Sequence, residues 1–223
     1  MTDRTRPHVA GDRFRNPTGQ NGRPQADVPR MLAERRAAWP STVPVTPRDV
    51  QARHSGAWAA VTFVGHSTFV VQTPSGTLIT DPMFSERASP VSFAGPRRVR
   101  QPGVPLARLP RIDLVLLSHN HYDHCDLPSL RALARRDDPV LLTPLGNARL
   151  ARAAGFRHVE ELDWWQRATL GSLPVTAAPA QHFSARTPWD RNRALWGSFV
   201  VEVSGRRLYF AGDSGYAPHF HEV

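Results

Sequence analysis

The feature that most constrains this 223-residue chain is an apolar run that ends abruptly in a histidine-rich loop. Ile112–Leu117 is apolar except for Asp113, which is typical of a strand buried on both faces of a sheet. The loop that follows, Ser118–Asp126, carries four metal-binding side chains within six residues. A solvated histidine-rich loop is the alternative, but it explains this spacing poorly directly after a buried strand. The segment therefore predicts a metal site at the end of a sheet.

The four side chains of this loop divide between two directions. On an extended chain His119 and His121 point the same way, because alternate side chains share one face. The loop can then turn Asp123 and His124 toward a second point nearby. Imidazole and carboxylate groups suit zinc, iron or manganese. The spacing thus indicates ligands for more than one metal ion.

Two more candidate ligands follow predicted strands further along the chain. His182 comes after the apolar run Val175–Ala178, and Asp213 follows Arg207–Phe210 in the sequence Gly-Asp-Ser-Gly. Alone, either residue would most simply be a hydrogen-bonded structural residue. Beside the histidine loop, both become candidate metal ligands, and the carboxylate of Asp213 can bridge two ions.

The remaining pattern predicts an α/β domain over residues 58–223 and an arm rich in Arg and Pro over residues 1–57. The arm either wraps the core or is partly disordered, with a short helix at Met31–Trp39. Asp126 is expected to cap a helix at Leu127–Arg135, and a second helix is expected at Asn147–Ala154. The other predicted strands are Ala59–Val64, Thr68–Gln72, Thr77–Thr80, Val140–Thr143, Arg157–Val159, Thr169–Leu170 and Ser198–Val203.

Composition and charge narrow the class of protein. No stretch approaches the ~18–20 apolar residues of a membrane-spanning helix, and the N-terminus lacks the apolar segment of a signal peptide. Cys125 is the single cysteine, which fits a reducing compartment, so we expect a cytoplasmic protein. The net charge is +9, and all 28 basic residues are arginine. They form no basic groove interleaved with aromatic residues, so we expect no nucleic acid partner. An anionic substrate or peripheral contact with a membrane is favoured slightly.

The motifs, taken in order from about residue 13 to the C-terminus, resemble the metallo-β-lactamase superfamily. The histidine loop, His182 and the turn around Asp213 carry the resemblance to the superfamily. The accessory motifs are Arg13-Phe14-Arg15-Asn16-Pro17, Gly65-His66-Ser67-Thr68, Asp81-Pro82-Met83-Phe84, Ala94-Gly95-Pro96-Arg97-Arg98, Leu195-Trp196-Gly197-Ser198 and Ala211-Gly212-Asp213-Ser214-Gly215-Tyr216. They are similar to those of one branch, the N-acyl-phosphatidylethanolamine-hydrolysing phospholipase D family.

The resemblance implies an αββα sandwich with two divalent ions between the edges of its sheets. It assigns one ion to His119, His121 and His182 and the second to Asp123 and His124, with Asp213 as the bridge. Zinc is the first choice, and manganese or iron are the alternatives.

The family's last histidine ligand has no counterpart before Val223. We therefore expect a weak second site and a sandwich that lacks its C-terminal closing elements. An exposed apolar face of the second sheet would then favour a homo-oligomer.

The resulting functional hypothesis is a metal-dependent phosphodiesterase of the phospholipase D type, in which a metal-bound hydroxide attacks phosphorus. Asp123 would orient the attacking water and shuttle its proton. His66, Tyr122 and Arg97 are weaker candidates for substrate contacts. The phospholipid-like substrate follows from the resemblance alone. The alternatives are another hydrolase on the same fold, such as a lactonase or a nuclease, and a catalytically weak truncated remnant.

Overall fold

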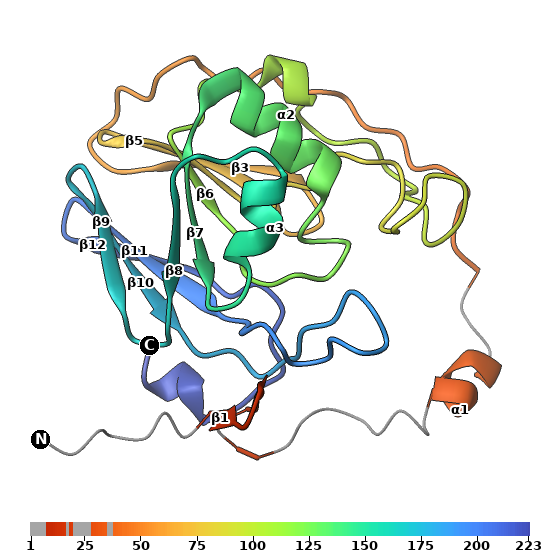
Figure 1. Ribbon diagram of the computed structural model, residues 1–223. Helices are drawn as coiled ribbons and strands as arrows, with labels where there is room; N and C mark the ends of the chain where they lie inside the picture. The colour runs from red at the N-terminus through yellow and green to blue at the C-terminus, as the bar shows by residue number, and fades with distance from the viewer. Residues whose placement is uncertain (1–7, 17, 20–27, 35–37) are drawn as a thin grey trace, which may run out of the picture.

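Two β-sheets packed face to face form the centre of the computed structural model, which describes residues 8–16, 18–19, 28–34 and 38–223 (Figure 1). The larger sheet has six strands in the order β3-β4-β5-β6-β7-β8. Strands β3 to β5 pair antiparallel, whereas β5 to β8 pair parallel. The bounds of these strands are β3 Ala60–Gly65, β4 Thr68–Thr73, β5 Gly76–Thr80, β6 Leu114–Leu116, β7 Val140–Pro144 and β8 Val159–Leu162.

The smaller sheet is antiparallel throughout, in the order β12-β11-β10-β9. Because β10 and β12 both pair with β11, they run in the same direction and end at the same edge of the sheet. The bounds of these strands are β9 Arg167–Leu170, β10 Leu173–Ala178, β11 Ser198–Val203 and β12 Arg206–Phe210.

The larger sheet is buried on both faces because side chains of each strand alternate between two apolar layers. In β4, Val71 belongs to the layer between the two sheets, and Val70 belongs to the layer under the helices. Helices α2 (Leu127–Asp137) and α3 (Ala148–Ala153) cover that second layer (Figure 1). A short 3-10 helix, η2 (Leu106–Arg108), precedes β6, and another, η3 (Pro218–His221), follows β12. The predicted sandwich of two sheets with helices outside it is confirmed.

Two helix predictions differ from the structure. The first helix, α1, occupies Val28–Ala33 rather than Met31–Trp39, although residues 35–37 of the predicted segment lie outside the described part of the chain. Asp126 stands at the N-terminus of α2, but its carboxylate does not cap the helix. Instead it accepts hydrogen bonds from the backbone N–H of Ser85 at 3.1 Å and from the Ser85 hydroxyl at 2.8 Å. The Ser129 hydroxyl of α2 also donates to this carboxylate, so the long-range contact with Ser85 replaces only the bond to the helix backbone.

The expectation of an exposed apolar face on the smaller sheet is wrong. Most apolar side chains of this sheet face the larger sheet, and Tyr209, which lies on the outer face beside Val200, contacts Phe220 of η3. The side chains that alternate with them include Arg167 and Glu202, which form an ion pair at 3.0 Å. Among the described residues, no large exposed apolar side chain belongs to β9–β12. The physical argument for a homo-oligomer therefore falls away.

The described residues of the N-terminal arm lie against the sandwich. Strands β1 (Val9–Ala10) and β2 (Arg13–Phe14) pair with each other, and the Phe14 N–H donates to the Asn192 carbonyl at 2.7 Å. The side chain of Asn16 is buried and contacts the backbone of His182. Over these residues the arm wraps the core and reaches a candidate metal ligand.

Candidate metal centre

The candidate ligands follow strands that end at one edge of the sandwich. Strands β5 and β6 are parallel neighbours, and they are followed by Asp81 and His119. Strands β10 and β12 end together in the smaller sheet, and they are followed by His182 and Asp213. The fold thereby gathers side chains that are distant in the sequence.

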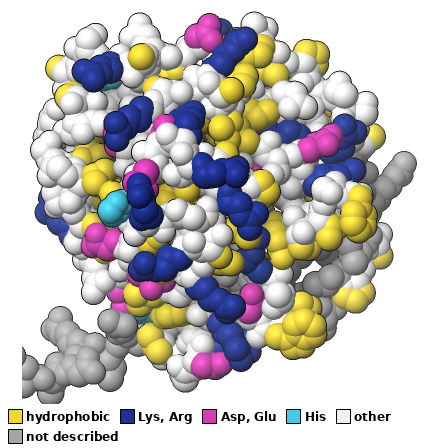
Figure 2. Space-filling view, turned by 45° about the horizontal axis from the view of Figure 1, so that its top comes forward, with side chains coloured by type: hydrophobic (Ala, Val, Ile, Leu, Met, Phe, Trp, Pro, Cys, Tyr) yellow, Lys and Arg dark blue, Asp and Glu magenta, His cyan; other side chains and the backbone are white. Residues whose placement is uncertain are grey.

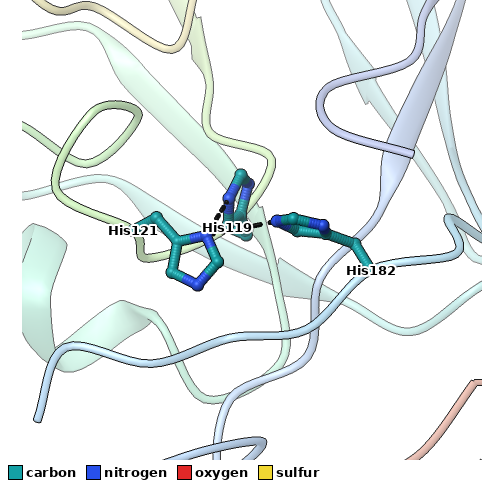
Figure 3. Close-up of side chains that lie close together, drawn as sticks. All are labelled: His119, His121 and His182. Carbon is teal, nitrogen blue, oxygen red and sulfur yellow. Dashed lines mark hydrogen bonds between the residues drawn. The ribbon is translucent and has the colours of Figure 1, made fainter. Parts of the chain in front are cut away.

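The first cluster consists of three imidazoles whose nitrogens point toward one another (Figure 3). His121 Nδ1 lies 2.9 Å from His119 Nε2 and 3.2 Å from His182 Nε2. Donor atoms bonded to one tetrahedral zinc at about 2.0–2.1 Å are about 3.3 Å apart. The separations therefore suit one ion, and the structure brings together the three histidines that the sequence singled out.

The second cluster lies beside the first. His124 Nε2 is 3.3 Å from Asp213 Oδ2 and 3.8 Å from Asp123 Oδ2. Asp213 Oδ2 is also 3.8 Å from His182 Nε2, so this carboxylate stands between the two clusters. The sequence analysis names His66 as a candidate substrate contact. In the structure it lies in this second cluster, where its Nε2 is 3.2 Å from Asp123 Oδ2.

Sequence reasoning missed the role of Asp81, which is fully buried behind both clusters. One carboxylate oxygen accepts from His124 Nδ1 at 2.6 Å and from the Ser118 hydroxyl at 2.5 Å, and the other accepts from the Ser118 N–H at 2.7 Å. The Ser118 hydroxyl in turn lies 2.8 Å from His119 Nδ1. Asp81 thus orients a side chain of each cluster. Its position directly after a buried strand was the available signal.

Burial keeps the three histidines of the first cluster neutral near pH 7. It lowers the pKa of His121 to about 4, and the nearby His182 contributes to the shift. Burial also lowers the pKa of His119, with further lowering from the neighbouring imidazoles, and it lowers the pKa of His182. A neutral imidazole keeps the lone pair that a metal ion requires.

In the second cluster, neighbouring carboxylates favour the charged form of the histidine. Burial opposes a charge on His124, but the Asp81 carboxylate and contacts with Asp213 outweigh it and raise the pKa of His124 to about 10. Burial also opposes the ionisation of Asp123, yet its bond to His66 and the charge of His124 lower the pKa of this carboxyl. The hydrogen bond from His124 lowers the pKa of Asp213. The carboxylates are therefore ionised and attract cations.

Arg186 holds the loop that carries the histidines. Its Nη1 donates to the carbonyls of Asn120 at 2.9 Å and of Cys125 at 2.8 Å. Its guanidinium lies 4.0 Å from the centre of the Tyr122 ring, and the Tyr122 hydroxyl donates to the Arg186 carbonyl at 3.0 Å. The hydroxyl of Tyr122 is therefore engaged in holding the loop.

A cavity of about 870 Å³ opens beside the two clusters. His121, Tyr122 and Asp123 form part of its wall, together with Phe63 and Met83, and arginines form another part. The arginines of this wall are Arg97, Arg98 and Arg100.

Two of the three arginines in the cavity wall, Arg97 and Arg98, form hydrogen bonds within the protein. The guanidinium of Arg97 pairs with Glu86 at 2.5 Å, and that of Arg98 donates to the carbonyl of Ser85 at 2.9 Å. On the face seen in Figure 2, basic side chains are spread among apolar ones. Arg97, which the sequence analysis names as a candidate substrate contact, therefore lines the cavity while paired with an acid.

Comparison with known proteins agrees with this architecture. Residues 77–223, more than half of the chain, match the family model described as the beta-lactamase superfamily domain. A metallo hydrolase of the archaeon Ignicoccus hospitalis has a similar fold, with a TM-score of 0.55 at 21% identity over 74% of this chain and 65% of that one. With two sheets and clustered histidines and aspartates at their edge, the chain belongs to the metallo-β-lactamase superfamily.

Two curated relatives extend the comparison. An uncharacterised protein of Mycobacterium tuberculosis is 40% identical over 74% of this chain and 44% of its own length. The N-acyl-phosphatidylethanolamine-hydrolyzing phospholipase D 1 of Caenorhabditis elegans is 33% identical over 79% of this chain and 52% of its own length. The chain thus spans about half the length of these relatives. In its described part, no helix is both long and apolar enough to cross a bilayer.

Proposed function

We propose that this chain forms a binuclear metal site that hydrolyses phosphodiesters, with N-acylated phosphatidylethanolamine as the lipid substrate. The observation that carries the proposal is the pair of donor clusters with the Asp213 carboxylate between them. Similarity to the C. elegans phospholipase supports the choice of a phosphodiester. Zinc is the preferred metal, with manganese and iron as alternatives, because the donors are imidazoles and carboxylates.

Each residue would have its own role at such a site. His119, His121 and His182 would hold one ion, Asp123 and His124 the other, and Asp213 both. When bound, the two ions supply Lewis acidity and a hydroxide nucleophile at neutral pH. Asp123 lines the cavity as an ionised carboxylate, so it would orient the attacking water and accept its proton. Asp81 and Ser118 keep the imidazoles of His119 and His124 in position from behind.

The cavity fits a substrate with a charged centre and an apolar tail. Phe63 and Met83 offer an apolar wall, and Arg100 offers a positive charge. Attack at phosphorus would break the bond to the ethanolamine oxygen and yield phosphatidic acid and an N-acylethanolamine. Trp39 also lines the cavity and is 79% exposed, which supports peripheral contact with a lipid surface.

The test combines metal analysis with hydrolysis of two phosphodiesters, the chromogenic bis(4-nitrophenyl) phosphate and an N-acylated phosphatidylethanolamine in micelles. The zinc-loaded chain should hydrolyse both. Asp213→Asn keeps the shape of the bridge but removes its charge, so it should lower metal occupancy and reduce turnover by orders of magnitude. Asp138→Asn is the matched control, because Asp138 pairs with Arg157 on the surface.

The outcomes separate the proposal from its alternatives. Hydrolysis of a lactone without hydrolysis of either phosphodiester would contradict the substrate class and favour a lactonase. A chain that binds metal but hydrolyses none of the three compounds would contradict the enzyme assignment and favour a non-catalytic metal-binding protein.

A further inference from the structure

We infer that His66 is a ligand of the second metal ion and completes a four-donor set with Asp123, His124 and Asp213. This inference rests on the proposed function, because it presumes that an ion occupies the second cluster. The resemblance to the superfamily assigns only the other three residues to that ion. From the sequence, His66 is a candidate for a substrate contact. The role of metal ligand is inferred from the structure.

The donor separations around His66 carry the inference. Its Nε2 lies 3.2 Å from Asp123 Oδ2 and 3.3 Å from His124 Nε2, and these atoms lie within 4.8 Å of one another. His124 Nε2 is in turn 3.3 Å from Asp213 Oδ2. These distances match the edge of about 3.3 Å in a tetrahedral zinc site, whereas the 3.8 Å between His124 Nε2 and Asp123 Oδ2 is longer.

A simple hydrogen bond between His66 and Asp123 accounts for only part of this arrangement. His66 Nε2 faces both a carboxylate oxygen and an imidazole nitrogen, whereas one N–H is best directed at a single acceptor. Because His124 Nδ1 donates to Asp81, Nε2 is the His124 nitrogen that faces the other donors, and a bound ion would take the place of the proton on Nε2. A cation satisfies the three converging atoms at once.

The backbone around His66 supports a functional placement of the side chain. His66 has a φ of +52°, a left-handed conformation that non-glycine residues adopt rarely and at a cost. It lies in the turn between β3 and β4, next to an irregularity of the strand pairing between Phe63 and Gly65. Such irregularities commonly redirect a side chain beside an active site.

Hydrogen bonds attach this turn to the end of β5. The Thr80 hydroxyl donates to the Ser67 carbonyl at 2.8 Å, and the Thr68 hydroxyl donates to the Asp81 carbonyl at 2.7 Å. His66 is therefore held in a fixed relation to Asp81, which orients His124. The turn between β3 and β4 and the end of β5 therefore position His66 directly and His124 through Asp81.

The test is a metal titration of the full chain and of His66→Asn, measured by elemental analysis and by competition with a chelator. Asparagine tolerates the left-handed conformation, so this variant removes the imidazole with little backbone strain. The unchanged chain should bind two zinc ions. His66→Asn should bind the first with unchanged affinity and the second more than about 100-fold more weakly, because loss of a partner outside the ligand shell already costs about 10–100-fold. In the cobalt-loaded protein, the visible absorption of the second ion should change as well.

His158→Asn is the matched control, because His158 is 61% exposed and belongs to neither cluster. It should leave both affinities unchanged. Two ions bound equally well by His66→Asn would overturn the inference about His66 and leave the proposed function standing. One ion bound by an unchanged chain that still hydrolyses phosphodiesters would overturn the inference and the binuclear site, but not the proposed phosphodiesterase activity. An unchanged chain that binds no ion would overturn both.

Discussion

At the scale of single residues, Asp81 offers the sharpest test of how the site is held. Its carboxylate accepts three hydrogen bonds, from His124 and from two groups of Ser118. In Asp81→Asn the amide nitrogen cannot accept, so at least one buried donor loses its partner at a cost of about 1–3 kcal/mol. We expect a lower free energy of unfolding and about 10–100-fold weaker zinc binding.

Denaturant titration and chelator competition measure the two effects of Asp81→Asn. Asp138→Asn again serves as the control, because it removes a carboxylate from the surface without touching the clusters. Unchanged zinc affinity in Asp81→Asn would show that the imidazole of His124 does not depend on this carboxylate.

Cys125 gives a second prediction at this scale. Its side chain is fully buried, and burial raises the pKa of the thiol to about 12. Because the thiolate is the reactive form, the native protein should resist a thiol reagent such as 5,5′-dithiobis(2-nitrobenzoate) at pH 8. In denaturant the same reagent should titrate one thiol per chain. Fast labelling of the native protein would show that the loop opens readily.

The sequence revealed some residues of the site and concealed others for a physical reason. His119, His121 and His124 stand close together in the chain, so their spacing alone indicated a metal site. Asp81 and His66 reach the site through strand pairing. A place directly after a strand is the one local signal that either residue carries, and it does not distinguish a positioning carboxylate or a ligand from an ordinary turn residue.

At the scale of elements, the N-terminal arm has a specific contact to test. Asn16 Nδ2 donates to the His182 carbonyl at 2.8 Å, and Asn16 Oδ1 accepts from the His182 N–H at 3.0 Å. Asn16 is 2% exposed, so Asn16→Ala leaves both backbone groups without these partners. We expect a loss of about 1–3 kcal/mol in the free energy of unfolding. Zinc binding at the three-histidine cluster should weaken as well, because the backbone of His182 is released.

Thr18→Ala is the matched control for the arm, because the Thr18 hydroxyl contacts Gln181 at the surface. It should change neither quantity appreciably. A stability loss in Asn16→Ala with unaltered zinc affinity would mean that the arm stabilises the fold without positioning His182.

Strands were easier to predict than the surfaces they present. Apolar runs predicted β4, β6 and β11 within a residue or two of their bounds, since burial on two faces leaves a continuous signal. By contrast, Arg157–Val159 was expected as a strand, and β8 begins only at Val159. The exposed apolar face was expected from comparison of whole folds, and the alternation of Arg167 and Glu202 with apolar residues shows why it does not form.

At the scale of the whole molecule, the open cavity and the charge of +9 point toward an anionic lipid surface. Trp39 is 79% exposed and lines the cavity. Phe93 is 82% exposed and stands in the sequence between Ala88 and Pro96, which both line the cavity. We therefore expect the protein to bind phosphatidylglycerol vesicles more tightly than phosphatidylcholine vesicles, with an affinity that falls as salt is raised. Sedimentation with vesicles measures this binding.

The double variant Trp39→Ala/Phe93→Ala should bind the anionic vesicles several-fold more weakly, because aromatic side chains favour the interface between lipid and water. Trp189→Ala is the matched control, since Trp189 is 76% exposed but neither lines the cavity nor stands in the sequence between residues that do. Binding that persists in the double variant and disappears with salt would make the contact purely electrostatic. Equal loss in Trp189→Ala would place the lipid contact away from the cavity, and the substrate would then have to reach the metal site by another route.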